Sequence, residues 1–279
     1  MTDDRSGRSV GRRALLGGIA GLTTASALGL DTATTAAAAT AQSRLGTGGY
    51  RVPTTLRTGY SAYGSGYVGT HSGEYAFTYN DGFYPICNAW ADSYHSILRW
   101  QTANTVGVWF IGLIGVTGGS GGSNHVAGNA MDITAIYHTD GNFVDCNYSH
   151  HGYAGVTHNR RYAALAWSAR KHMPEVGIVG TDPRHTNHIH AGRYKNGSAS
   201  LLLSHYGASW DAWLMQYTCK AFMGAPIALD GNWGNQTESY YLQLMSRLGY
   251  AGRNPFGSTA HLQDLAHTLT AYGVIGAAI

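Results

Sequence analysis

The sequence predicts an α+β protein, in which a small antiparallel sheet with flanking helices precedes a small all-α domain at the C-terminal end. The uninterrupted β-branched and aromatic run Val106–Val116 is typical of a strand buried on both faces. Segments with apolar residues at helical spacing lie on both sides of this run, and helical patterns dominate from residue 210 onward. The chain has 279 residues, which suffices for one sizeable domain and a smaller one.

Residues 1–41 have the composition of an export signal. The pair Arg12-Arg13 precedes a weakly apolar run, Ala14–Leu30, and the small residues at 39–41 fit a cleavage site. The arginine pair favours the twin-arginine type of signal, and an ordinary secretory signal is the alternative. We therefore expect a secreted mature protein that begins near Gln42 and has no membrane span.

Changes in periodicity, with glycine and proline, mark the elements of the first domain, which we assign to residues 42–195. Short strands and loops are expected over 46–82, and Pro174 is expected to stop the second helix. In the first helix, the residues expected to face the core are Trp90, Tyr94, Ile97, Leu98 and Trp100. The expected elements are a helix over Asn88–Trp100, the strand Val106–Val116, a strand over Met131–Tyr137, a helix over Asn159–His172 and a strand around Asn187–Ala191.

Residues 196–209 are expected to link this domain to three short helices over 210–279. The first of these helices covers Trp210–Met223. The second is expected to be capped by Thr237 and to end at Gly249, and the third to be capped by Ser258 or Thr259. Their apolar stripes predict a packed core and indicate nothing about ligands.

The composition excludes some functions. Only 12% of the residues are charged and the net charge is +3, so the clustered basic surface of a nucleic-acid-binding protein is not expected. The three cysteines would lie in an oxidising compartment after export. We expect Cys87 and Cys146 to pair and Cys219 to be buried, and we expect a monomer.

Two local patterns stand out among the 14 histidines, and together they can supply a metal site. A catalytic zinc needs three ligands drawn from histidine nitrogen and carboxylate oxygen, with a fourth position open for water. Gly128 permits a tight reversal that lets His125 and Asp132 converge. In the second pattern, alternation along a strand places His188 and His190 on one face. The patterns are Ser123-Asn-His125-Val-Ala-Gly128-Asn-Ala130-Met-Asp132 and His185-Thr-Asn-His188-Ile-His190.

The motif SxHxxGxAxD followed by HxH resembles the lysostaphin and D-Ala-D-Ala metallopeptidase superfamily. The additional His185 makes the second motif similar to that of the penicillin-insensitive murein endopeptidases, with zinc D-Ala-D-Ala carboxypeptidases as the alternative branch. The resemblance implies a zinc ion held by His125, Asp132 and His190. It also implies that His188 activates water or stabilises the oxyanion.

Other parts of the family pattern are modified here. His185 has the opposite strand parity to His188, so it must lie on a loop before the strand, and Pro183 favours such a loop. Some branches carry a glutamate general base shortly before the last ligand, but no glutamate occupies that stretch here. Asp182 is the nearby carboxylate and the candidate base, with His185 as an auxiliary.

The segment Asp230-Gly-Asn-Trp-Gly-Asn-Gln-Thr237 resembles the DGxxGxxT signature of the three-helix peptidoglycan-binding domain. Such a domain would hold the enzyme on the cell wall and raise its local concentration there. The two resemblances imply a cell-wall-associated zinc peptidase that hydrolyses peptide bonds of peptidoglycan, in cross-links or stem peptides. A D-Ala-D-Ala carboxypeptidase and a non-catalytic zinc-containing wall-binding protein are the alternatives.

Overall fold

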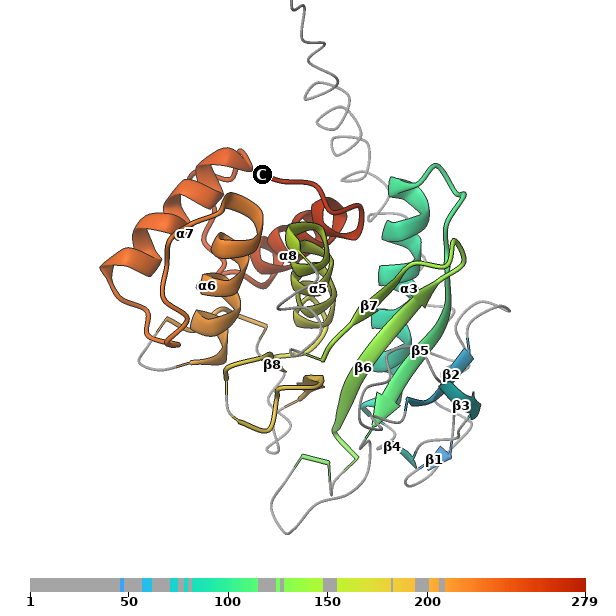
Figure 1. Ribbon diagram of the computed structural model, residues 1–279. Coiled ribbons are helices and arrows are strands. Elements are labelled where there is room, and N and C mark those ends of the chain that lie inside the picture. Colours follow the sequence, from blue (N-terminus) through green and yellow to red (C-terminus); the bar gives the residue numbers. More distant parts are fainter. Residues whose placement is uncertain are drawn as a thin grey trace, which may run out of the picture. The chain divides into compact units, whose positions relative to one another are not determined.

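A computed structural model gives the fold of the protein, and the α+β prediction is confirmed (Figure 1). The residues it describes all belong to one compact unit, Ser43–Ile279, so the predicted export signal lies outside them. Among these residues, no helix is both long enough and apolar enough to cross a membrane. The described residues are 46–47, 57–61, 71–74, 78–79, 82–114, 124–125, 128–147, 155–181, 183–193, 201–205 and 209–279.

The central sheet has the strand order β3-β2-β5-β6-β9-β8, with β7 paired to β6. Its pairs are antiparallel, as predicted, except for the parallel pair of β2 and β5. The sequence did not predict β7 or β8, because three residues are too few to show a period. The strands are β2 (Arg57–Ser61), β3 (His71–Glu74), β5 (Val108–Ile114), β6 (Ala130–His138), β7 (Phe143–Asp145), β8 (Glu175–Gly177) and β9 (Ile189–Gly192), and a separate pair is formed by β1 (Gly46–Thr47) and β4 (Thr78–Tyr79).

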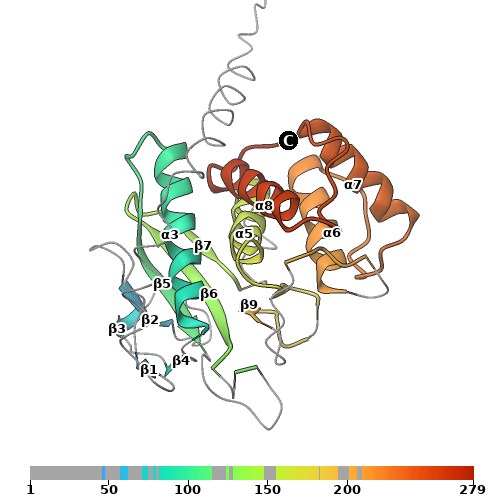
Figure 2. The same ribbon diagram turned by 180° about the vertical axis from the view of Figure 1, so that it is seen from behind.

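Two helices form much of the core of the first part of the chain. Helix α3 (Tyr84–Gln101) lies behind β5 and β6 in Figure 1 and in front of them in Figure 2. Helix α5 (Gly155–Arg170) is joined to α3 by a buried hydrogen bond of 2.9 Å from Trp90 Nε1 to Ser168 Oγ. The predicted core positions of α3 are buried, but Trp100 is 39% exposed because it lies in the last turn of the helix.

The C-terminal helices are α6 (Trp210–Met223), α7 (Asn235–Arg247) and α8 (Thr259–Val274). Ser258 caps α8 as predicted, but the N-cap of α7 is Gly234, and Thr237 lies within the first turn. Helix α8 packs closely on α5, because a Cβ on Gly273 would lie 2.5 Å from the Cβ of Ala164. The C-terminal helices therefore share one hydrophobic core with α3 and α5.

The cysteine prediction was half right. Cys219 is buried, and Cys87 and Cys146 are buried too, but neither of these two thiols forms a disulfide, so the expected pairing is wrong. Both thiols lie within the hydrophobic core, where burial raises the pKa of Cys146 well above its usual value. These cysteines behave as small apolar side chains.

A buried ion pair ties α6 to α5. The Arg170 side chain is 1% exposed, and its Nε donates to Asp211 Oδ1 at 2.7 Å. Asp211→Ala leaves this guanidinium without its counter-ion, so we expect a loss of about 3–5 kcal/mol in the free energy of unfolding in urea. Asp264→Ala is the matched control: its partner Arg253 is 36% exposed, and such surface pairs contribute about 0–1 kcal/mol. Equal losses in the two variants would contradict this account.

Candidate metal centre

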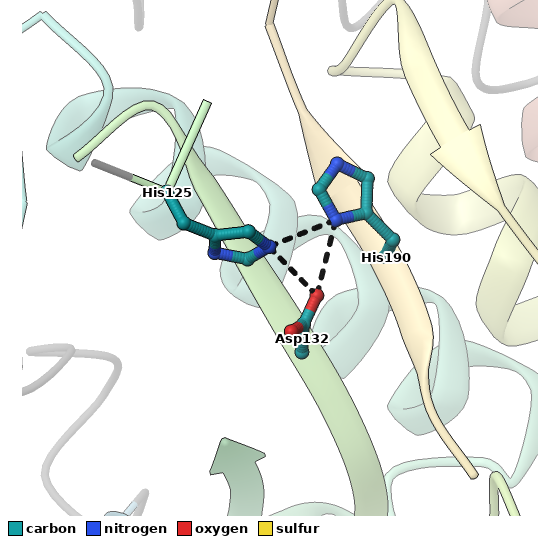
Figure 3. Close-up of side chains that lie close together, drawn as sticks. All are labelled: His125, Asp132 and His190. Atoms are coloured by element: carbon teal, nitrogen blue, oxygen red, sulfur yellow. Dashed lines mark hydrogen bonds and ion pairs between the residues drawn. The ribbon is translucent and has the colours of Figure 1, made fainter. Parts of the chain in front are cut away.

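Three side chains of the predicted site converge in the structure. His125, Asp132 and His190 each direct one ligand atom to a common point, as Figure 3 shows. His125 Nε2 lies 3.1 Å from His190 Nδ1 and 3.2 Å from Asp132 Oδ1. His190 Nδ1 lies 3.1 Å from the same carboxylate oxygen. The group could hold a metal ion.

Strand pairing brings two of these residues together. Asp132 on β6 stands directly opposite His190 on β9, and directly opposed residues of an antiparallel pair share a face. The neighbouring residues Ile133 and Ile189 are fully buried on the core side. Alternation therefore turns Asp132 and His190 to the face away from the core. His188, which the sequence placed on the same strand face as His190, instead lies just before β9, because the strand begins at Ile189.

A tight turn brings the third residue. Gly128 has a φ of 65°, a conformation that glycine adopts readily, and its N–H donates to His125 O at 3.0 Å. The N–H of Asn129 donates to Asn124 O at 2.9 Å, which closes the turn a second time. The chain therefore reverses between His125 and β6, as the position of Gly128 predicted.

The donor geometry fits a tetrahedral metal ion. Ligand atoms about 2.0–2.1 Å from a tetrahedral zinc lie about 3.3 Å from one another. The three separations observed here are 3.1, 3.2 and 3.1 Å. Hydrogen bonds alone satisfy this triangle poorly, because one ring N–H cannot point at two acceptors at once. Two imidazole nitrogens and one carboxylate oxygen also form a donor set that zinc commonly takes.

The carboxyl group of Asp132 carries a negative charge at neutral pH. Burial of Asp132 opposes ionisation, but hydrogen bonds from His125 and His190 and the charge of His188 outweigh it, so its pKa lies well below the usual range. The carboxylate is therefore ionised at neutral pH. The side chains of His125 and Asp132 remain 15% and 13% exposed, so both are partly accessible to solvent.

Two further histidines of the second motif surround this group. His188 Nε2 lies 3.5 Å from Asp132 Oδ1, and His188 Nδ1 donates to Asn187 Oδ1 at 2.8 Å. His185 lies on a turn before β9, as its parity required, and its ring centroid is 5.1 Å from that of His188 and 5.6 Å from that of His190. Asp182, the predicted base, and Ser123 both lie outside the described residues.

The structure adds two side chains that the sequence did not single out. Trp210, the first residue of α6, makes edge contacts with His185 and His190 at centroid distances of 5.2 and 5.5 Å. This approach depends on Gly177, where a Cβ would lie 3.2 Å from both the Trp210 and His185 rings. Helix α6 thus contributes directly to the surroundings of the candidate metal centre.

The second addition is Glu175 on β8, which accepts a hydrogen bond from the side chain of Asn124. Burial raises the pKa of Glu175, opposed by His190, Asn124 and His125. Only the pairing of the short strand β8 reveals the proximity of Glu175, and no motif in the sequence does.

Comparisons of the chain with protein-family models, with curated proteins and with solved structures found no match. What the site can do is therefore inferred from its residues and their geometry.

Proposed function

We propose that the chain is a secreted, zinc-dependent peptidase that hydrolyses peptide bonds in bacterial peptidoglycan, within cross-links or stem peptides. The observation that carries the proposal is the convergence of His125, Asp132 and His190 with His188 beside the shared carboxylate. A structural zinc site is usually closed by four protein ligands, whereas three ligands are typical of a catalytic one. Zinc in such a site lowers the pKa of water and polarises a carbonyl group.

His188 is the proposed proton-transfer residue. Its Nδ1 donates to the Asn187 side chain, which fixes the ring and directs Nε2 toward the metal ligands. An imidazole nitrogen held at that position can accept a proton from attacking water or donate a hydrogen bond to the developing oxyanion. His185, held by Thr181 Oγ1 at 3.0 Å, is proposed to maintain the position of the neighbouring rings.

The proposed substrate class rests on the two resemblances. In the DGxxGxxT segment, Asp230 Oδ1 accepts from Asn232 N–H at 2.9 Å and from Gln216 Nε2 at 2.7 Å. Gln216 lies on α6, so the segment ties the start of α7 to that helix. These hydrogen bonds give the segment a defined conformation. We propose that the C-terminal helices bind peptidoglycan and keep the enzyme on the wall.

Mass spectrometry of purified peptidoglycan, digested by the zinc-loaded protein, tests the proposal. We expect cross-linked dimers to be converted to monomers, and we expect a chelator to stop the reaction and added zinc to restore it. Release of D-Ala alone would identify a carboxypeptidase instead. An unchanged wall, although zinc is bound, would contradict the proposed activity and favour a non-catalytic wall-binding protein.

A further inference from the structure

Glu175 lies on the same face of the sheet as the metal ligands. In the β8–β9 pair, Gly177 stands opposite His190 and Glu175 opposite Gly192. Because side chains two residues apart share a face, Glu175 projects on the side of His190 and Asp132. Glu175 is half-buried, and both histidine ligands are close enough to influence its ionisation.

One hydrogen bond connects this edge strand with the turn that carries His125. Asn124 Nδ2 donates to Glu175 Oε2, across 51 positions of the sequence. Asn124 is the residue before the ligand, and its carbonyl also closes the turn by accepting from Asn129 N–H. The bond therefore attaches the start of the turn to the sheet at the metal centre.

The three ligands differ in how the backbone supports them. Asp132 and His190 are fixed by the ladder between β6 and β9, whereas His125 lies in a turn outside any strand. Fixing a residue outside regular structure costs backbone conformational entropy. If a hydrogen bond already holds the turn before the metal binds, less conformational entropy is lost on binding, and the metal is bound more tightly.

We propose that Glu175 is a positioning residue, which acts through Asn124 to hold His125 in the geometry that binds the metal. The inference rests on the proposed zinc site. It concerns the orientation of a ligand rather than any contact with the substrate.

Zinc affinity of the full-length chain, measured by competition with a chromophoric chelator at pH 7, tests this role. Glu175→Ala and Asn124→Ala should each weaken zinc binding by about 10- to 100-fold, the usual effect of losing a partner of a metal ligand. The double variant Asn124→Ala/Glu175→Ala should bind within about threefold of the weaker single variant, because both changes remove the same bond.

An exchange of the two groups provides the sharpest control. Asn124→Asp/Glu175→Gln keeps both side-chain lengths and the net charge, and it restores an amide–carboxylate bond with donor and acceptor reversed. We expect its zinc affinity to return to within about threefold of that of the original chain. Circular dichroism and urea unfolding show whether each variant is folded, and the exchanged pair keeps the test valid if an alanine variant unfolds.

The outcomes separate the two proposals. The positioning role would be overturned if the exchanged pair bound zinc as weakly as the alanine variants. It would also be overturned if the double alanine variant lost zinc affinity by the product of the two single losses. Unchanged affinity in every variant would overturn it too, while leaving the zinc site intact. If the original chain binds no zinc, the proposed function fails and this inference fails with it.

Discussion

His190→Ala is expected to raise the dissociation constant for zinc by much more than about 100-fold. That figure is the upper end of the effect of losing a residue that hydrogen-bonds to a metal ligand. His190 Nδ1 is one of only three donor atoms that converge among the described residues, and it lies 3.1 Å from each of the other two. Its removal leaves two protein ligands, fewer than catalytic zinc sites use. Equilibrium competition with a chelator measures the effect.

His261→Ala is the matched control for this prediction. His261 lies on α8, and its Nδ1 accepts from the backbone N–H of Asn254. Its loss should leave zinc affinity unchanged. Equal zinc affinity in His190→Ala and in the original chain would contradict the assignment of the metal centre.

The second large effect is expected in catalysis rather than in metal binding. His188→Ala should lower the rate of peptide hydrolysis by about 10²- to 10⁴-fold, the range that general acid–base groups contribute. Zinc content should stay at the level of the original chain, because His188 Nε2 stands beside the carboxylate, outside the group of three ligand atoms. Single-turnover hydrolysis of a cross-linked muropeptide, with zinc quantified in the same sample, measures both quantities.

Asn187→Ala refines the second test. It keeps His188 but removes the acceptor of the 2.8 Å bond at Nδ1, so a smaller loss of rate is expected. A fully active His188→Ala would contradict the proposed proton-transfer role. Loss of zinc from His188→Ala would make the residue a ligand instead.

The candidate ligand group was predicted because the motif resemblance named its three residues, and the structure brings these residues together. Strand alternation puts His190 on the face of Asp132, and Gly128 allows the turn that returns His125 to the same point. Long periodic segments were equally informative: α6 covers Trp210–Met223, as predicted. Helix α3 begins four residues earlier than expected, at Tyr84 rather than Asn88, with a proline in its first turn.

Features that depend on contacts between distant segments could not be found in this way. Glu175 lies on a strand of three residues, and its bond to Asn124 depends on where β8 pairs. Trp210 was predicted only as the first residue of a helix, yet it contacts His185 and His190. The cap of α7 was misplaced because Thr237 has the chemistry of an N-cap, although the chain enters the helix at Gly234.

Diffraction from crystals of the zinc-loaded protein, measured on both sides of the zinc absorption edge, tests the central claim most directly. The account predicts one strong anomalous peak about 2.0–2.2 Å from His125 Nε2, Asp132 Oδ1 and His190 Nδ1. Absence of a peak at this position in crystals that contain zinc, or a peak at other residues, would contradict it.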